Sequence, residues 1–285
     1  MSTKEPPTRS AFRDYLIAEN RAGSNKAVSY LRALDLLQEL LRKESMGFAD
    51  CQDLWRVWSV PRLHELLLRV REEQKRNQQS PWYLPEQQSY LRNGFISAAL
   101  GQYRYFLVEY RHQQHLMNLL RDHQGDPDEL AELLNREAEI PEALLPEMEG
   151  KEAIRATKVR INQGGFRKII LDTYQNRCCI TGLDIPQINI ASHIIPWAEN
   201  KKTRMDPRNG LCLSATYDKA FDNHLITFDE DYRLVVSNEI RDHYRNDHAR
   251  ELFEKREGQV IWIPQKAERR PLHEFLSVHR SKLIA

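Results

Sequence analysis

The chain has 285 residues, of which 41% are hydrophobic and 29% are charged, and its 42 basic residues almost balance 41 acidic ones. This length and apolar content suffice for two domains, each with its own core. No apolar run approaches the roughly 20 residues of a membrane helix, and the first residues lack a signal-peptide core, so we expect a soluble, cytoplasmic protein with no membrane partner.

The four cysteines argue against two other classes of protein. Cys51, Cys178, Cys179 and Cys212 are too few and too scattered for a disulfide framework. No two of them have the two-residue separation of a zinc knuckle. We therefore expect neither a disulfide-rich protein nor structural zinc.

The first 125 residues have a helical pattern. Apolar residues recur at spacings of three and four in "AVSYLRALDLLQELL", "LWRVWSVPRLHELLLRV" and "ISAALGQYRYFLVEY". The intervening "RNQQSPWYLPEQQ", with its two prolines, indicates a loop. The pattern predicts an all-helical domain over residues 1–125.

Residues 126–150 differ in charge from the sequence on either side. They contain nine acids and only one base, Arg136, together with three prolines. We predict an acidic linker, in which "DPDELAELLNREAEI" could form a short helix. Without these acids both flanking regions are net basic, which suits two domains that face nucleic acid.

Shorter elements follow over residues 151–285. "ATKVRINQGGFRKIILDTY" predicts a basic amphipathic helix interrupted at Gly164 and Gly165, "INIASHII" a strand, "SATYDKAFD" a short helix, and "LITFDEDYRLVVS" two strands. A charged helix in "EIRDHYRNDHARELFEK", a strand in "QVIWIP" and a last helix after Pro271 would brace this module. The fold class predicted is α+β, with a helical domain followed by a small mixed module.

The order of "SHIIP", "NGLCLS" and "ATYDKAFD" suits phosphodiester cleavage. That reaction needs a base to activate water, positive charge on the phosphate and stabilisation of the leaving oxygen. A histidine at the end of one strand, a returning second strand and a metal ligand in the first turns of a helix can supply all three.

Four ordered motifs strengthen this interpretation: "RCCITGLD", "ASHIIPWAE", "DPRNGLCLS" and "YDKAFDNHLITFD". From about Ile161 to Asp231 the sequence resembles the HNH endonucleases with the ββα-metal fold, in particular the bacterial branch found among restriction endonucleases. The resemblance implies that residues 151–285 form a ββα-metal nuclease domain.

By position, the resemblance implies roles for individual residues. His193 would be the general base, and Asn209 would fix the loop that orients it. Asp218 occupies the metal-ligand slot, and Asp222 lies one helical turn further on, so the implied ion is Mg²⁺ or Mn²⁺. Two positions depart from the family pattern: Ser192 stands where many relatives have a metal-binding aspartate, and Tyr217 where histidine is frequent.

Several of these residues also have structural interpretations. A lone histidine is more often structural than catalytic, so the functional reading of His193 depends on its register with Asn209 and Asp218. Asp222 suits helix capping as well as it suits metal binding. Four residues at helical spacing correspond to a family segment that approaches nucleic acid, or else form a solvated basic face: Arg160, Gln163, Arg167 and Lys168.

The N-terminal helices carry a second, less specific resemblance. "SNKAVSYLRALDLLQELL", "LWRVW" and "ISAALGQYRYFL" resemble the helical core-binding domain of tyrosine recombinases over about ninety residues. This implies a clamp that holds duplex DNA while the C-terminal module cuts. The alternative is a domain that docks a partner protein.

Three functional hypotheses follow. The first is a metal-dependent DNA endonuclease of bacterial restriction or anti-phage defence, which would nick DNA, or cleave both strands as a homodimer or in two visits, with other defence proteins as further partners. The second is a nucleic-acid-binding or partner-docking protein with a decayed HNH site, as Ser192 and Tyr217 permit. The third is an RNA-directed nuclease toxin.

Overall fold

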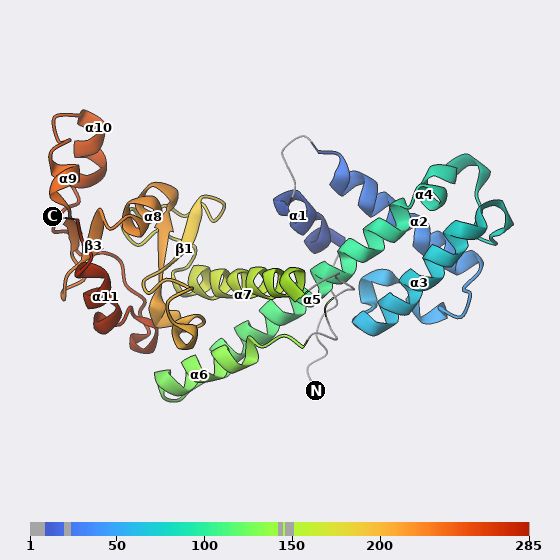
Figure 1. The fold of residues 1–285 in the computed structure, drawn as a ribbon, viewed down its shortest axis with the longest axis horizontal. Helices are drawn as coiled ribbons and strands as arrows, with labels where there is room; N and C mark the ends of the chain where they lie inside the picture. The colour runs from blue at the N-terminus through green and yellow to red at the C-terminus, as the bar shows by residue number, and fades with distance from the viewer. Residues whose placement is uncertain (1–8, 20–23, 142–144, 146–150, 285) are drawn as a thin grey trace. The chain divides into compact units, whose positions relative to one another are not determined.

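The computed structural model describes residues 9–19, 24–141, 145 and 151–284, and the chain forms two compact units (Figure 1). One comprises residues 1–111 and 141–155, and the other residues 112–140 and 156–285. The division falls within α5 (Phe95–Asp122) and within α7 (Lys151–Thr173). The predicted α+β class is confirmed. None of the helices described is both long and apolar enough to cross a bilayer.

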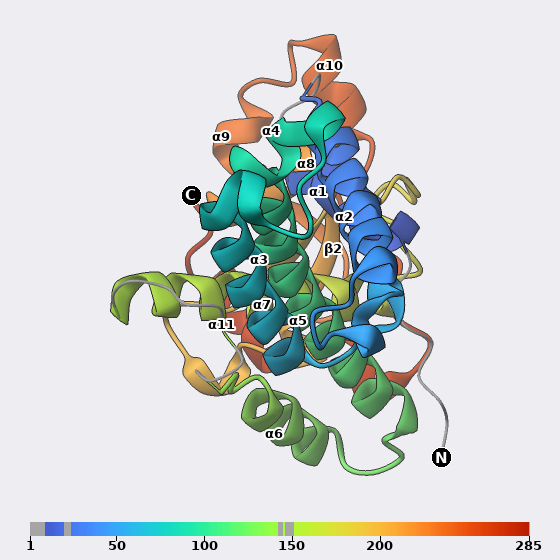
Figure 2. The ribbon, with the colours of Figure 1, turned by 90° about the vertical axis from the view of Figure 1, so that its right-hand side faces the viewer.

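The first unit is helical. It contains α1 (Arg9–Glu19), α2 (Lys26–Lys43), α3 (Val60–Arg76), the short α4 (Gln88–Arg92) and the first part of α5. Figure 2 shows α2, α3 and α5 running alongside one another. Phe12 of α1 packs with ring centroids 5.2 Å from Tyr103 and 5.3 Å from Phe106, which both belong to α5. The apolar spacing predicted from the sequence thus becomes an aromatic core.

The second unit contains two small antiparallel sheets. β1 (Asn189–His193) pairs with β2 (Gly210–Ser214), and β3 (Ile226–Phe228) pairs with β4 (Leu234–Val236). Helix α8 (Ala215–Asp222) packs against β1, β2 and β3, and α11 (His273–Arg280) packs against β3. The order β1, β2, α8 is the ββα order predicted from the sequence.

Helix α6 (Pro127–Glu137) also belongs to the second unit. The side chain of Asp126 accepts a hydrogen bond from Asp128 N and caps the helix, while Leu130 and Leu134 are buried in the core of the unit. The compact units therefore differ from the predicted division into 1–125, 126–150 and 151–285, because two leucines four residues apart bury one face of the acidic segment. Residues 142–144 and 146–150 of the predicted linker lie outside the described residues.

The predicted interruption of α7 at Gly164 and Gly165 is wrong. The helix runs without a break from Lys151 to Thr173. A Cβ atom added to Gly165 would lie 2.7 Å from Leu116 Cδ1 of α5, closer than real Cβ atoms come. This glycine lets the C-terminal parts of α5 and α7 approach one another rather than ending the helix.

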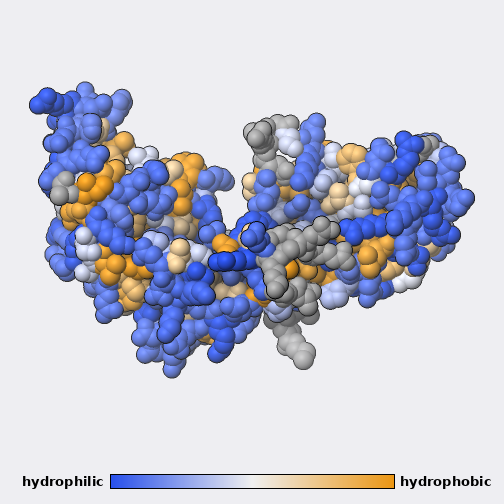
Figure 3. Space-filling model, viewed as in Figure 1, coloured by the Kyte–Doolittle hydropathy of each residue, from blue (hydrophilic) through white to orange (hydrophobic). Residues whose placement is uncertain are grey.

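The C-terminal part has shorter helical segments than predicted. Residues 238–257, here called the arm, form α9 (Asn238–Arg241), α10 (Asp247–Ala249) and a π-helical stretch (Arg250–Glu254) in place of one helix. The side chain of Asn246 caps a new start at α10, which explains the break. Figure 3 shows that the surface of the arm is hydrophilic. The strand predicted in "QVIWIP" is reduced to one bridge between Val260 and Arg233.

Candidate active site

The two strands of the first sheet and the helix after them form the frame of the site. β1 ends at His193, directly opposite Gly210, where β2 begins. Residues 194–209 form the loop between the strands and include two short helical turns, η6 (Lys201–Thr203) and η7 (Pro207–Asn209). Helix α8 follows β2 at once and carries Asp218 in its first turn. The pairing of His193 with Gly210 thus places the two ends of the loop next to each other.

Aromatic side chains enclose the His193 ring. Phe166 of α7 stacks on it with centroids 3.7 Å apart, and Trp197 meets it edge-on at 5.5 Å. Gly210 makes this possible, because a Cβ at that position would lie 2.8 Å from Phe166 Cζ and 2.3 Å from Ile170 Cδ1. A larger residue at the start of β2 would therefore displace the ring that supports His193.

A single hydrogen bond identifies the protonated nitrogen of His193. Nε2 lies 3.1 Å from the carbonyl oxygen of Arg204, and a carbonyl can only accept, so Nε2 carries the proton and Nδ1 the lone pair. Burial lowers the pKa of His193 to about 4; the bond to the Arg204 carbonyl opposes this shift and the Arg204 charge adds to it. The ring is therefore neutral at pH 7 and can accept a proton at Nδ1.

Asn209 holds the loop that follows His193. Its side chain is fully buried. Oδ1 accepts from Ile195 N at 2.7 Å, while Nδ2 donates to the carbonyls of Ile195 at 3.1 Å and Thr203 at 3.0 Å. Because Thr203 directly precedes Arg204, Asn209 fixes the peptide next to the one that presents the acceptor for His193. This arrangement fits the loop-fixing role implied by the sequence.

The two predicted metal ligands lie one turn apart on α8. Asp218 is partly buried and Asp222 is exposed. Burial raises the pKa of Asp218, and the nearby charge of Asp222 raises it further. Neither carboxylate has a cation at ion-pair distance among the described residues, although the charge of Lys219 lowers the pKa of both.

Ser192 directly precedes His193 on β1, at the slot where many relatives have aspartate. Its side chain is buried, and its Oγ makes no hydrogen bond of ordinary distance and angle with any described residue. The hydroxyl is nevertheless near enough to Asp218 to lower the pKa of that carboxyl. An orphaned buried oxygen beside an unpaired carboxylate fits a hard cation, which prefers oxygen donors.

The protein donors near α8 are few. Nowhere in the described part of the chain do three or more His, Cys, Asp or Glu side chains gather closely enough to hold one ion. A divalent ion at Asp218 would thus take most of its ligands from water and substrate, as Mg²⁺ commonly does.

Tyr217, one of the two departures from the family pattern, is a packing residue. It is 1% exposed, its hydroxyl donates to the Leu252 carbonyl, and its ring meets Phe253 edge-on at 5.6 Å. Tyr217 therefore fastens the arm to α8 next to Asp218.

His224 has a φ of 54°, in the left-handed region that favours glycine. Its Nδ1 lies 3.2 Å from Nε2 of His279, a buried residue that also contacts the Phe221 carbonyl and the Thr227 hydroxyl. Sequence patterns did not indicate His279, because it lies 55 residues from His224. The pair secures the end of α8.

The four predicted nucleic-acid contacts on α7 have different surroundings. Gln163 and Lys168 are exposed, whereas Arg160 is partly buried and already interacts with a neighbour. Arg167 donates through its two terminal nitrogens to the carbonyls of Asn189 and Pro186, both at 2.6 Å. Its guanidinium anchors the start of β1, so contact with phosphate stays a prediction mainly for the other three.

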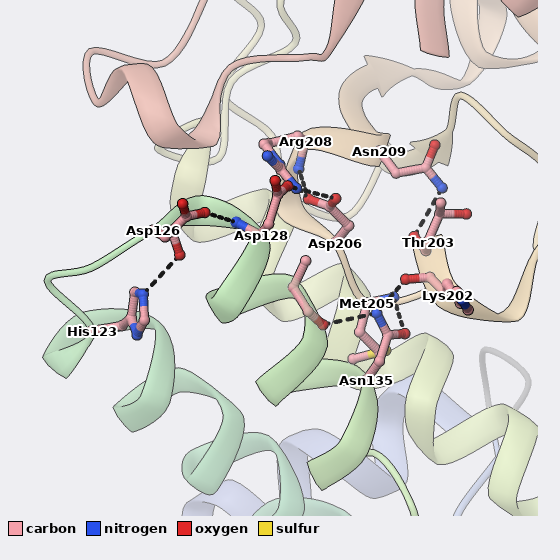
Figure 4. Close-up of polar contacts among 11 residues, drawn as sticks. His123, Asp126, Asp128, Asn135, Lys202, Thr203, Met205, Asp206, Arg208 and Asn209 are labelled. Carbon is pink, nitrogen blue, oxygen red and sulfur yellow. Dashed lines mark hydrogen bonds and ion pairs between the residues drawn. The ribbon is translucent and has the colours of Figure 1, made fainter. Parts of the chain in front are cut away.

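Helix α6 supplies contacts to the loop that the sequence did not indicate (Figure 4). Asp128 accepts from Arg208 at 2.7 Å, and Arg208 also pairs with Asp206 at 2.8 Å. Asn135 reaches both Lys202 and Met205. Asp128 and Asn135 belong to the acidic segment that was predicted to be a linker. Their partners in the loop lie 67 to 80 residues further along the chain.

β1 thus ends in a partly buried, neutral histidine, a buried asparagine holds the loop that follows it, and the helix after β2 carries two carboxylates. Residues 178–229 match the family described as HNH endonuclease. Over these residues the predicted resemblance to HNH endonucleases is confirmed, and they form a module of the HNH type. No curated protein matches the chain. The likeness of the N-terminal helices to tyrosine recombinases stays a prediction.

Proposed function

We propose that the protein is a metal-dependent DNA endonuclease in which His193 is the general base and a divalent ion binds at Asp218. The observation that carries this proposal is the state of His193: one nitrogen is committed to the Arg204 carbonyl, the other keeps its lone pair, and the ring is neutral at pH 7. A histidine works as a base only when its tautomer and its direction are fixed.

The proposed reaction is hydrolysis of a phosphodiester. Nδ1 of His193 removes a proton from a water molecule as its oxygen attacks phosphorus, and the bond from phosphorus to the leaving oxygen breaks. The imidazolium formed is stabilised by the Nε2 hydrogen bond to the Arg204 carbonyl. Phe166 and Trp197 hold the ring plane during the transfer. When bound, the divalent ion supplies positive charge to the phosphate and the leaving oxygen.

Asp218 is the residue we assign to the ion, with Asp222 as a second carboxylate. Support comes from the raised pKa of Asp218, the lack of an ion pair to either carboxylate within the described chain and the orphaned Ser192 hydroxyl. Carboxylate and hydroxyl oxygens favour Mg²⁺ or Mn²⁺ over softer ions.

The substrate and biological setting are further parts of the proposal. The family match supports nuclease chemistry, and the resemblance to restriction enzymes favours DNA and a role in restriction or anti-phage defence, with other defence proteins as partners. One module contains one base, so each engagement would break one strand. Cleavage of both strands would need a homodimer or two visits. The N-terminal helices would clamp the duplex or dock a partner.

The test is cleavage of supercoiled plasmid by the full chain with Mg²⁺ or Mn²⁺. The wild type is expected to nick or linearise the plasmid, and both His193→Ala and Asp218→Ala are expected to lose this activity. His243→Ala and Asp242→Ala provide matched controls, since both residues are exposed on the arm. Activity that survives His193→Ala would overturn the assignment of the base.

Parallel substrates separate the other functions. DNA binding without cleavage under every ion condition would support a binding module with a decayed site. Cleavage of RNA in preference to both single-stranded and duplex DNA would support the toxin hypothesis. If His243→Ala and Asp242→Ala lost as much activity as His193→Ala and Asp218→Ala, the losses would reflect impaired folding and not the loss of a catalytic group.

A further inference from the structure

The side chain of Asn135 bonds to the peptide segment that orients His193. Its Oδ1 accepts from Met205 N at 3.1 Å, and its Nδ2 donates to the Lys202 carbonyl at 2.5 Å and to the Ala131 carbonyl of its own helix at 2.8 Å. An amide nitrogen has two hydrogens, so both donations can be made at once. The amide thus bridges α6 and the two ends of the segment 202–205 (Figure 4).

Successive carbonyls of this segment have different partners. The Lys202 oxygen accepts from Asn135, the Thr203 oxygen accepts from Asn209, and the Arg204 oxygen accepts from His193. The next group along the chain, Met205 N, donates to Asn135. The peptide that serves His193 is therefore held on both sides by side-chain amides, one from the HNH motif and one from outside it.

Helix α6 is itself firmly placed. Leu130 and Leu134 are 2% and 0% exposed and share one core with Met205, which is 1% exposed. Near the start of the helix, Asp128 pairs with the buried Arg208, the residue before Asn209. Displacing Asn135 relative to the loop would thus require disrupting a packed core. This rigidity lets a side chain outside the strands control a position inside the site.

We propose that Asn135 is a positioning residue for the general base: it fixes the Arg204 carbonyl and so holds His193 in the tautomer with the proton on Nε2. The inference rests on the proposed function of His193. Sixteen residues, 194–209, separate the strands, and no sheet pairing holds them in place. Side-chain amides take over that task, and Asn135 is the one contributed by α6.

The decisive experiment reads the His193 tautomer by nitrogen NMR of the full chain labelled with ¹⁵N-histidine. At pH 7 the wild type is expected to show mostly the form protonated at Nε2. In Asn135→Ala the carbonyl is freed, so we expect a mixture of both tautomers. The kcat for plasmid cleavage should fall roughly 10- to 100-fold, because small misplacements of a catalytic group have effects of that order. The KM for DNA and the half-saturating ion concentration should change less than about twofold, since neither contact is touched.

Asn189→Ala is the matched control. Asn189 is fully buried, whereas Asn135 is partly buried. Asn189 likewise donates to two carbonyls, those of Asn176 and Leu183, but it lies at the opposite end of β1. It should lower the unfolding midpoint at least as much as Asn135→Ala does, with the His193 tautomer unchanged. If Asn135→Ala does not fold, Asn135→Asp serves in its place, because it keeps the acceptor for Met205 N and loses the donor to Lys202.

The outcomes separate this inference from the proposed function. An unchanged tautomer in both Asn135 variants, or an equal change in Asn189→Ala, would overturn the positioning role. A wild type that cleaves no substrate would overturn the proposed function, while the tautomer comparison would still decide the positioning role.

Discussion

The histidine and the carboxylates of the candidate site differ in how firmly the surrounding protein holds them. His193 has a ring stacked on one face, a second ring at its edge and a hydrogen bond at one nitrogen. Asp218, in contrast, has a raised pKa, a like charge one turn away and an unpartnered hydroxyl beside it. Protein contacts hold the histidine ring in place, whereas the two carboxylates have no cation at ion-pair distance among the described residues. Catalytic geometry and metal affinity should thus respond to different mutations.

Asn209→Ala tests the histidine end and should have the largest effect. Its loss leaves the N–H and carbonyl of Ile195 unpaired, at a cost of about 1–3 kcal/mol in unfolding free energy for each group, while the Thr203 carbonyl keeps its bond from Asp206 N. We expect kcat for plasmid cleavage to fall about 100-fold, with no recovery when Mg²⁺ is raised. Asp218→Ala, assayed over the same Mg²⁺ series, should recover in part. Recovery of Asn209→Ala at high Mg²⁺ would show that the two ends are not independent.

Ser192→Asp tests the carboxylate end by adding a ligand where relatives have one. The new carboxylate beside Asp218 should lower the half-saturating Mn²⁺ concentration about tenfold, equivalent to about 1.4 kcal/mol of binding free energy. In EDTA the same variant should unfold at lower urea, because a buried carboxylate without a cation is costly. Ser192→Asn, similar in size and neutral, should show neither effect. An unchanged Mn²⁺ dependence would place the ion away from Ser192.

Acid should destabilise the protein through three histidines that are partly or fully buried. Burial lowers the pKa of His193, His112 and His279 to about 4 in each case, against about 6.5 in an unfolded chain. The unfolded state therefore binds more protons between pH 6.5 and pH 4, and stability is complete above that window and falls as pH drops through it. Urea unfolding at pH 7 and pH 5 measures this loss. His279→Gln should reduce the pH dependence.

Asp218 contributes to the pH dependence with the opposite sign. Burial beside Asp222 raises the pKa of Asp218, so the folded state favours its protonated form, and this contribution is lost as pH rises through the folded pKa. Without an ion, Asp218→Asn should therefore stabilise the protein at pH 7, and added Mn²⁺ should stabilise only the wild type. A destabilised Asp218→Asn in EDTA would mean that the carboxylate already has a partner.

The smallest effect is expected at the ion pair between α6 and the loop. Asp128 is 81% exposed on its side chain, whereas the side chain of Arg208 is 10% exposed and keeps Asp206 as a buried partner. Asp128→Asn should thus lower the unfolding free energy by no more than about 1 kcal/mol, and less at high salt. Urea unfolding at two salt concentrations measures it. A larger loss would indicate that this pair, and not Asn135, dominates the attachment of α6.

The sequence was sufficient for the parts of the site that depend on local order. His193, Asn209 and Asp218 follow one another within a single β-turn-β-helix unit, so their spacing predicts their arrangement without long-range information. Their contacts agree with the strand register and with the place of Asp218 in the first turn of α8. The roles in catalysis and metal binding stay predictions.

The remaining features depend on contacts between segments far apart in the chain, and the spacing of residues in the sequence does not predict such contacts. The acidic composition of "DELAELLNRE" concealed the buried Leu130 and Leu134, so α6 was predicted to be part of a linker. Arg167 looked like a basic surface residue, although its guanidinium satisfies two carbonyls. A glycine pair looked like a helix break, because only the neighbouring helix shows why a side chain is excluded there. In each case tertiary packing overrode a local preference.

The contacts of α6 also determine how large a fragment must be to keep the site intact. A fragment cut at residue 151, the boundary that composition suggests, would keep every motif of the HNH family and still lose Asn135, Asp128, Leu130 and Leu134. In the loop, the Lys202 carbonyl and Met205 N would then lose their bonds to Asn135, and Arg208 would lose its ion pair with Asp128. Grafting this activity into another protein would require a cassette that starts near His112, so the sequence motif is smaller than the part that must be transplanted.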